Sequence, residues 1–370
     1  MINSLLENKA KSHLQKSGIV INGKHQWDII IHDKSIYKDV FIKGSLGLGD
    51  GYANGKWDVE SIDIFFEKLL RAEIGFSPNV MDYLYNLRNI ILNTQIGKRA
   101  FAVGEKHYDL GNTMYSYMLG KSMTYSSARF LNKNDSLTKA QYNKLDQLCK
   151  KLRLKPGMKI LEIGSGWGSF AKFAIKNYKV EVVGLTVSKE QKKFSESQCK
   201  NLPAKFLLLD YQKLDKKYYK YFDRIVSIEM IEAVGKKNLK KFFSTIAFVL
   251  KDDGLAGLQA IIGTGNDDLF LSTRIFPNGH VPSEREIINN SSRSLKIIHW
   301  ESFGKNYDNT LILWEKNFRN HWKKITKKNP KNVYNEKFYR MWRYYLLLCA
   351  ASFRVGLNDV AQIIMSKKAS

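Results

Sequence analysis

Short apolar runs alternate with amphipathic segments through the middle of the chain. The runs MKILEIG, VEVVGLTV, KFLLLDY and FDRIVSIEM have the composition of buried strands, and the segments between them, such as SFAKFAIKNY, carry apolar residues at helical spacing. Strands of this kind that alternate with helices predict a parallel sheet covered by helices on both faces. The predicted fold class from about residue 135 onward is therefore α/β, with a doubly wound and mostly parallel sheet.

The first 95 residues follow a different pattern. SLLENKAKSHLQKSG and WDVESIDIFFEKLLRAEIG each carry apolar residues at helical spacing and end in a glycine, which predicts two helices. The segment GSLGLGDGYANG between them is rich in glycine, which is typical of turns. We therefore predict a small, mainly helical domain over residues 1–95 and a larger domain over residues 96–370, with helical insertions after about residue 263.

Charge distinguishes the same two parts. The chain of 370 residues has 60 Lys and Arg against 35 Asp and Glu, a net charge of +25 with a pI near 9.7. The first 95 residues hold 11 residues of each sign, so the excess belongs to residues 96–370. Such an excess favours an anionic partner, either a nucleic acid, an anionic membrane surface or a phosphorylated substrate. A base-biased genome produces the same excess, so charge alone does not select a function.

Other features narrow the class of protein. The three cysteines are odd in number and far apart, which argues against a disulfide framework and against a cysteine zinc site. The seven histidines show no HxxxH or HExxH spacing, so we expect no metal site. The start of the chain is charged where a signal peptide needs an apolar stretch, and the apolar run at 344–351 is too short to span a membrane. We expect a cytoplasmic protein, soluble or peripherally associated with the inner membrane.

A glycine loop follows the first strand of the predicted sheet. Gly164, Gly166 and Gly168 let the backbone turn sharply and approach a ligand at the positive end of the next helix. A dinucleotide site needs an acid about 20 residues later for the ribose, but this chain has Thr186 and Gln191 there. The loop therefore favours S-adenosylmethionine over a dinucleotide.

Motifs along nearly the whole chain together resemble those of the cyclopropane-fatty-acyl-phospholipid synthases. They are GSLGLGDGYANGKWD, KHYDLGNTMYSYML, MTYSSARF, LEIGSGWGSFAKFA, GLTVSKEQ, FDRIVSIEMIEAVG, IFPNGHVPS, YDNTL and YYLLLCAASF. The resemblance implies a Rossmann-like class I methyltransferase fold. It also implies transfer of a methylene group from S-adenosylmethionine to the cis double bond of unsaturated phospholipid acyl chains, which forms a cyclopropane ring. The implied steps are methyl transfer, a carbocation and deprotonation assisted by bicarbonate.

The resemblance also implies partners and site residues. The partners are unsaturated phospholipids, an anionic membrane surface and a second copy of the chain, with the N-terminal domain in contact with lipid and no nucleic acid involved. The cofactor site would be lined by Tyr125, Ser126, Gly164, Gly166, Gly168, Thr186, Gln191, Tyr211 and Gln212, and the catalytic residues would be Glu232, Tyr307, Ser127 and Gln259.

Two of these catalytic positions depart from the family pattern. Ser127 stands where the family has a cysteine, and Gln259 stands at the position of a histidine; both belong to the set expected to hold bicarbonate. Because a hydroxyl and an amide can still donate hydrogen bonds, we expect bicarbonate to be retained. Weaker bicarbonate binding is one alternative. The others are a methyltransferase that acts on the acyl chain or on an amine without closing a ring, and a catalytically weak paralogue that binds lipid.

Overall fold

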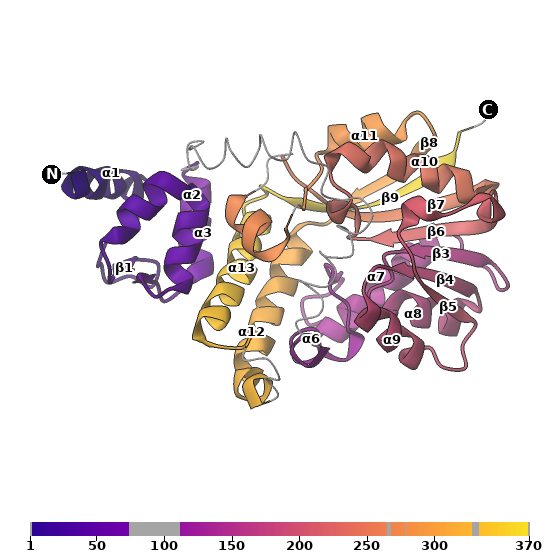
Figure 1. The fold of residues 1–370 in the computed structure, drawn as a ribbon, viewed down its shortest axis with the longest axis horizontal. Helices are drawn as coiled ribbons and strands as arrows, with labels where there is room; N and C mark the ends of the chain where they lie inside the picture. The colour runs from indigo at the N-terminus through magenta and orange to yellow at the C-terminus, as the bar shows by residue number, and fades with distance from the viewer. Residues whose placement is uncertain (1, 74–111, 265–267, 278, 328–332, 369–370) are drawn as a thin grey trace. The chain divides into compact units, whose positions relative to one another are not determined.

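The computed structural model of the chain describes residues 2–73, 112–264, 268–277, 279–327 and 333–368. The chain divides into two compact units, each made of segments that lie far apart in the sequence (Figure 1). Unit 1 combines Met1–Asn93, Asp267–Asn278 and Tyr307–Asn358, and unit 2 combines Thr94–Asn266, Gly279–Asn306 and Asp359–Ser370.

Unit 2 is built on a sheet of seven strands in the order β5-β4-β3-β6-β7-β9-β8. In chain order the strands are β3 (Lys159–Ile163), β4 (Glu181–Thr186), β5 (Ala204–Leu208), β6 (Phe222–Ile228), β7 (Leu250–Ile262), β8 (Leu295–Ser302) and β9 (Asp359–Lys367). The first five run parallel, whereas β9 pairs antiparallel with both β7 and β8. The predicted fold class, a doubly wound and mostly parallel sheet, is confirmed.

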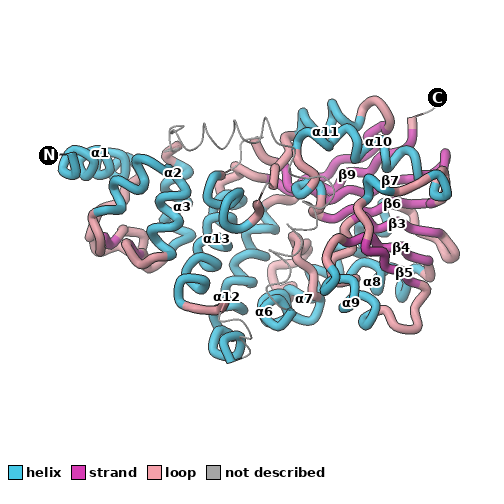
Figure 2. The backbone as a smooth tube through the Cα atoms, in the orientation of Figure 1, coloured by secondary structure: helices cyan, strands magenta, loops and turns pink. Residues whose placement is uncertain are grey.

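Helices cover both faces of this sheet, and Figure 2 shows the strands as one layer between them. The helices of unit 2 are α6 (Asn112–Leu119), α7 (Leu137–Lys151), α8 (Ser169–Tyr178), α9 (Lys189–Gln198), α10 (Leu239–Val249) and α11 (Glu284–Ser291), with short 3-10 turns η1 (Gly120–Ser122), η2 (Tyr211–Lys213), η3 (Lys216–Tyr218), η4 (Ile231–Ala233) and η5 (Lys236–Asn238). Apolar residues of α7 and α8 form one core, and those of α10 and α11 form a second. Apolar strands buried on both faces are what a parallel sheet requires.

Unit 1 is mainly helical. Its elements are α1 (Ile2–Lys16), α2 (Ser35–Ala53), α3 (Ile62–Arg71), the π-helical turn η6 (Leu271–Ile275), α12 (Lys305–Lys327) and α13 (Glu336–Arg354), with a small pair of strands, β1 (Ile30–Ile31) and β2 (Trp57–Asp58). Helix α13 packs against both α2 and α3. The sequence pattern placed residues 96–370 in one domain, whereas the structure groups residues 307–358 with the N-terminal residues because these helices share one core.

Aromatic rings fill the core of unit 1. Trp57 packs on Phe65 with ring centroids 5.3 Å apart, and Phe66 meets Tyr344 of α13 at 5.0 Å. Arg340 of α13 donates to the backbone oxygen of Trp57 at 2.9 Å. Aromatic side chains on α13 thus account for the apolar stripe that the sequence shows there, and an arginine of the same helix is held inside the unit.

The glycine-rich segment is helical, which corrects the prediction of turns. It forms the second half of α2, after a kink at Gly44, where φ is +54°. A Cβ atom at Gly49 would lie 2.2 Å from the ring of Phe270, and one at Gly51 would lie 2.2 Å from Ile36. These two glycines serve close packing of a helix rather than chain reversal.

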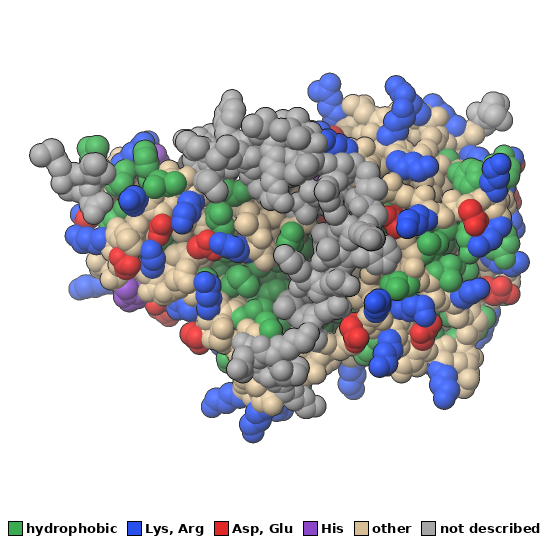
Figure 3. Space-filling view, viewed as in Figure 1, with side chains coloured by type: hydrophobic (Ala, Val, Ile, Leu, Met, Phe, Trp, Pro, Cys, Tyr) green, Lys and Arg blue, Asp and Glu red, His purple; other side chains and the backbone are tan. Residues whose placement is uncertain are grey.

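Neither the described helices nor the basic side chains on the face in Figure 3 mark a membrane-binding region of the fold. Among the described helices, none is long and apolar enough to cross a membrane. On the face shown in Figure 3, Lys and Arg side chains are scattered rather than gathered in one patch. The net charge of +25 therefore does not by itself mark a binding surface on that face.

Candidate active site

The glycine loop lies at the carboxyl end of β3, between this strand and α8. The backbone φ angles of Gly164, Gly166 and Gly168 are +84°, +50° and +81°, which only glycine adopts without strain. The N–H groups of Gly164 and Ser165 donate to the carbonyl of Leu185 on β4 at 3.0 and 2.8 Å, which fixes the loop. A Cβ atom at Gly166 would meet nothing within 4 Å. Because β3 has β4 on one side and β6 on the other, the loop lies at the point where the strand order reverses. Doubly wound sheets bind their ligands at this point.

Two unpartnered oxygens lie beside this loop. Glu162 is buried in β3, and burial raises the pKa of its carboxyl well above the ordinary value. Its Oε2 atom and the hydroxyl of Ser165 have no hydrogen-bond partner among the described residues. Buried oxygens of this kind suit a ligand that brings hydrogen-bond donors or positive charge.

The ends of β4 and β5 supply the other predicted cofactor residues. Thr186 donates its hydroxyl to Gln191 at 2.9 Å. The carboxylate of Asp210 accepts from the backbone N–H of Gln212 at 3.0 Å and so begins η2. Within the described part of the chain, the buried Tyr211 hydroxyl and the Gln212 side-chain nitrogen have no partner. Free hydroxyl and amide groups at strand ends suit the ribose and adenine of S-adenosylmethionine, so the residues present fit this cofactor.

Glu232 lies in η4, directly after β6. Its Oε1 atom accepts from the backbone N–H of Ile261 at 2.6 Å, and its carbonyl accepts from the N–H of His280 at 2.8 Å. Its Oε2 atom has no partner among the described residues. Burial and then the charge of Glu229 raise the pKa of the Glu232 carboxyl to about 8. This shift favours the protonated form of the Glu232 carboxyl at neutral pH.

Ser127 and Gln259 come together around a residue that the sequence interpretation left out. The backbone N–H of Ser127 and the side-chain amide of Gln259 both donate to Oε1 of Glu229, at 2.9 and 2.8 Å. Gln259 also donates to the carbonyl of Ser127 at 3.3 Å, and its own oxygen accepts from Gln362 of β9 at 3.1 Å. Gln259 is fully buried and pairs with Ile228, the last residue of β6.

A buried lysine stands next to this group. Lys144 of α7 is fully buried, and its ammonium donates to the hydroxyl of Ser126 at 2.7 Å. Burial lowers the pKa of Lys144, and the negative charge of Glu229 opposes that shift. The Ser126 carbonyl accepts from Gln141 at 2.9 Å. The hydroxyl that the resemblance assigned to cofactor binding is thus engaged within the protein, while Tyr125 beside it packs against Tyr115 at 5.4 Å.

Lys144, Glu229 and Gln362 are the residues of this cluster that sequence reasoning missed. For Lys144 a signal existed, because it falls four residues after Ala140 and four before Leu148, on the apolar face of the predicted helix. Glu229 is the first acid of the motif EMIEAVG, in which only the second acid was singled out. For Gln362 there was no signal, since β9 itself was not predicted.

Tyr307 belongs to unit 1. It lies near the start of α12, where its buried ring packs on Phe353 at 4.6 Å and on Trp314 at 5.9 Å. Its assignment to the catalytic set stays a prediction. The motif segment KHYDLG, residues 106–111, lies outside the described residues.

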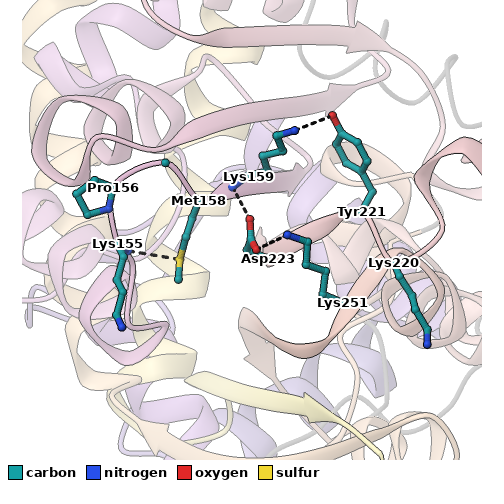
Figure 4. Close-up of a pocket in the computed structure, with 9 residues that line it drawn as sticks. Lys155, Pro156, Met158, Lys159, Lys220, Tyr221, Asp223 and Lys251 are labelled. Carbon is teal, nitrogen blue, oxygen red and sulfur yellow. Dashed lines mark hydrogen bonds and ion pairs between the residues drawn. The ribbon is translucent and has the colours of Figure 1, made fainter.

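A separate pocket lies at the opposite, amino end of the strands, as Figure 4 shows. It has a volume of about 540 Å³ and is lined by Lys155, Pro156, Gly157, Met158, Lys159, Lys220, Tyr221, Asp223 and Lys251. Asp223 accepts from the backbone N–H of Lys159 at 2.8 Å and pairs with Lys251 at 2.6 Å. Ligands of doubly wound sheets bind at the carboxyl ends of the strands, so this pocket is not part of the candidate active site.

The sheet order and the glycine loop at its reversal define the class I S-adenosylmethionine-dependent methyltransferases. The chain is similar to the mycolic acid cyclopropane synthase CmaA1 complexed with SAH and CTAB, with a TM-score of 0.66 and 31% identity over 72% of this chain and 98% of that one. Residues 95–363 match the family described as mycolic acid cyclopropane synthetase. The chain belongs to this cyclopropane synthase family.

Two relatives are informative. The cyclopropane-fatty-acyl-phospholipid synthase of Escherichia coli (strain K12) is 40% identical over 363 residues, which cover 97% of this chain and 92% of that protein. A probable fatty acid methyltransferase of Pseudomonas putida is 34% identical over 275 residues, covering 70% of this chain and 68% of that protein. The names of both relatives describe enzymes that act on fatty acids or fatty acyl chains.

Proposed function

We propose that this protein transfers a methylene group from S-adenosylmethionine to cis double bonds of unsaturated phospholipid acyl chains and so forms cyclopropane rings. The observation that carries the proposal is the match to the Escherichia coli synthase, which spans nearly the full length of both chains. The site supports it, because the glycine loop and two acids of the motif EMIEAVG stand at the carboxyl ends of neighbouring strands, β3 and β6.

The chain's part in the first step is positioning. S-adenosylmethionine, when bound, supplies an electrophilic methyl group. The loop from Gly164 to Gly168, with Thr186, Gln191, Tyr211 and Gln212, would hold it. An unactivated alkene is a poor nucleophile, so the site must align the double bond with that methyl group. Methyl transfer leaves a carbocation on the lipid, and negative charge fixed nearby stabilises it.

Two of the residues expected to hold bicarbonate, Ser127 and Gln259, do not fit that role. Both N–H bonds of the Gln259 amide are used, one toward Glu229 and one toward the carbonyl of Ser127. The Ser127 hydroxyl donates to the carbonyl of Ala128 at 3.2 Å, and its N–H donates to Glu229. The two residues expected to donate to bicarbonate therefore already donate to groups of the protein.

Access to the substrate requires contact with a membrane, and we propose a cytoplasmic enzyme that associates peripherally with the inner membrane. Apolar side chains on α1 and α2 support a lipid-binding role for unit 1, since Leu5 is 71% exposed and Phe41 is 58% exposed. Lys and Arg near an anionic leaflet contribute about 1 kcal/mol each. The basic excess of residues 96–370 supports this attraction. We also propose that the enzyme acts as a homodimer.

Lipid analysis tests the function. A host lacking cyclopropane lipids would express the chain or its Glu232→Gln variant. The expected product is an acyl chain that has gained one CH₂ group, shows the upfield proton signals of a cyclopropane ring and is no longer cut by ozone. A lipid that gains CH₂ but keeps an ozone-sensitive double bond would favour a fatty acid methyltransferase, the alternative supported by the Pseudomonas putida relative. Unchanged lipids, with purified protein that binds both cofactor and vesicles, would favour an inactive lipid-binding paralogue.

A further inference from the structure

The carboxylate of Glu229 stands where this site would otherwise need an added base. Its Oε1 atom accepts two hydrogen bonds, from the N–H of Ser127 and the amide of Gln259. Those are the two residues whose family counterparts are expected to hold bicarbonate. The amide of Gln259 is oriented in turn, because its oxygen accepts from Gln362. Both donors thus hold a carboxylate that belongs to the chain itself.

The two acids of the site, Glu229 and Glu232, have different surroundings. Glu232 receives one backbone hydrogen bond from Ile261, and burial keeps it protonated. Glu229 receives two N–H donors and has the ammonium of Lys144 as its nearby countercharge. Two carboxyl groups in environments that differ in this way take opposite roles, one as acid and the other as base. Glu229 is thus the acid of the pair whose carboxylate accepts two N–H donors and faces a positive charge.

The backbone at Glu229 is held in an unfavourable conformation. Its φ angle is +47°, in the left-handed region that favours glycine, and its N–H donates to the carbonyl of Gln259 at 2.7 Å. A side chain in this region costs about 1–2 kcal/mol relative to glycine. Strain of this kind persists where the surrounding structure fixes the residue, and it is common at functional sites.

We propose that Glu229 is the catalytic base of ring closure and takes the place of bicarbonate; this inference rests on the proposed function. After methyl transfer, one C–H bond of the transferred methyl group breaks. Its electron pair forms the second C–C bond of the ring and neutralises the carbocation. The proton passes to the carboxylate of Glu229, which becomes a carboxylic acid and releases the proton to water before the next turnover.

The test uses the full-length protein, S-adenosylmethionine and vesicles of dioleoyl phosphatidylethanolamine and dioleoyl phosphatidylglycerol. The rate of cyclopropane formation is measured in buffer freed of carbon dioxide, with and without added bicarbonate. For the unmodified protein we expect a change of less than about twofold on addition. For Glu229→Gly we expect a loss of about 10²–10⁴-fold, the contribution usual for a positioned base, and partial recovery with added bicarbonate or formate. Glycine suits the backbone at this position, so the variant keeps its fold.

Two comparisons make the result specific. Glu229→Gln keeps the size of the side chain and fills the space that an added anion would need, so we expect the same loss without recovery. Calorimetric binding of S-adenosylmethionine to each variant verifies that the fold persists. Strong dependence of the unmodified protein on bicarbonate, together with an active Glu229→Gln variant, would overturn the inference and leave the proposed function standing. Absence of any ring product from the unmodified protein, with and without bicarbonate, would overturn both.

Discussion

Glu229 and Glu232 lie three residues apart after β6, and the negative charge of the first adds to burial in raising the pKa of the second to about 8. One short turn thus presents a proton donor and a proton acceptor beside the glycine loop. A Cβ atom at Gly164 would lie 2.5 Å from Met230, which stands between the two acids. The turn that carries the two acids therefore packs against the predicted cofactor loop through Met230, within unit 2.

Replacing Glu232 by glutamine should separate chemistry from binding. Glutamine keeps the acceptor for the N–H of Ile261 but cannot exchange a proton, so we expect turnover to fall by about 10²–10⁴-fold. Affinity for S-adenosylmethionine should change by less than about threefold, because no predicted cofactor residue is altered. Turnover on unsaturated vesicles and calorimetric cofactor binding measure the two effects. Equal losses in both would contradict a role in chemistry.

The same substitution should stabilise the fold at alkaline pH. The pKa of Glu232 in the folded protein, about 8, lies above its ordinary value of 4.5, so the folded state binds this proton more tightly than the unfolded chain does. The resulting stabilisation is complete below pH 4.5 and is lost as the pH rises through 8. At a pH of about 9 the free energy of unfolding of Glu232→Gln should exceed that of the unmodified protein, on the order of a few kcal/mol. The exposed Glu181→Gln variant is the control, and denaturant titrations across pH measure the difference.

Two glycines provide a matched test of the cofactor loop. Gly166 and Gly157 both have positive φ angles, +50° and +80°, and a Cβ atom at either would meet nothing within 4 Å. Alanine at each position should therefore cost a similar 1–2 kcal/mol or so of stability from backbone strain. Only Gly166→Ala should also weaken S-adenosylmethionine binding, by about tenfold or more, because only its Cβ projects from the predicted loop. Equal affinities of the two variants would place the cofactor elsewhere.

Arg354 should be important for the stability of unit 1. Its guanidinium pairs with Asp63 at 2.9 Å, with Glu67 at 3.1 Å and with Asp308 at 2.9 Å. Arg354→Met leaves three partly buried acids without this partner, so we expect a loss of about 2 kcal/mol in the free energy of unfolding. Arg71 also pairs with Glu67 at 2.9 Å but is 58% exposed, so Arg71→Met should cost less than about 0.5 kcal/mol. Urea unfolding of both variants measures the contrast, and similar losses would refute it.

Strands β3 to β6 of unit 2 could be predicted because each of these four is a short apolar run bounded by polar or glycine positions. Strand β9 was not predicted, and the reason is physical. It carries Gln362 among apolar residues, and it follows a long helix at a great distance in sequence from its partners β7 and β8. The grouping of α13 with unit 1 also depends on long-range packing, which the local pattern does not contain.

At the site, the motifs identified the strand ends but not the partners of each side chain. Ser127 and Gln259 lie together in the structure, yet their donors serve Glu229 rather than an added anion. No local sequence pattern predicts the hydrogen bond between Ser127 and Glu229, which are 102 positions apart. The helix pattern places Lys144 on an apolar face, but it does not indicate that Glu229 lies nearby.

The place of β9 in the sheet has a consequence for protein synthesis. β8 is joined to the rest of the sheet through β9, and Gln362 on β9 orients the amide of Gln259. Because residues 359–367 are translated after the other described strands, a nascent chain that already contains β7 and β8 still lacks the strand that joins them. The Gln259 amide should therefore gain its Gln362 partner only when β9 has left the ribosome.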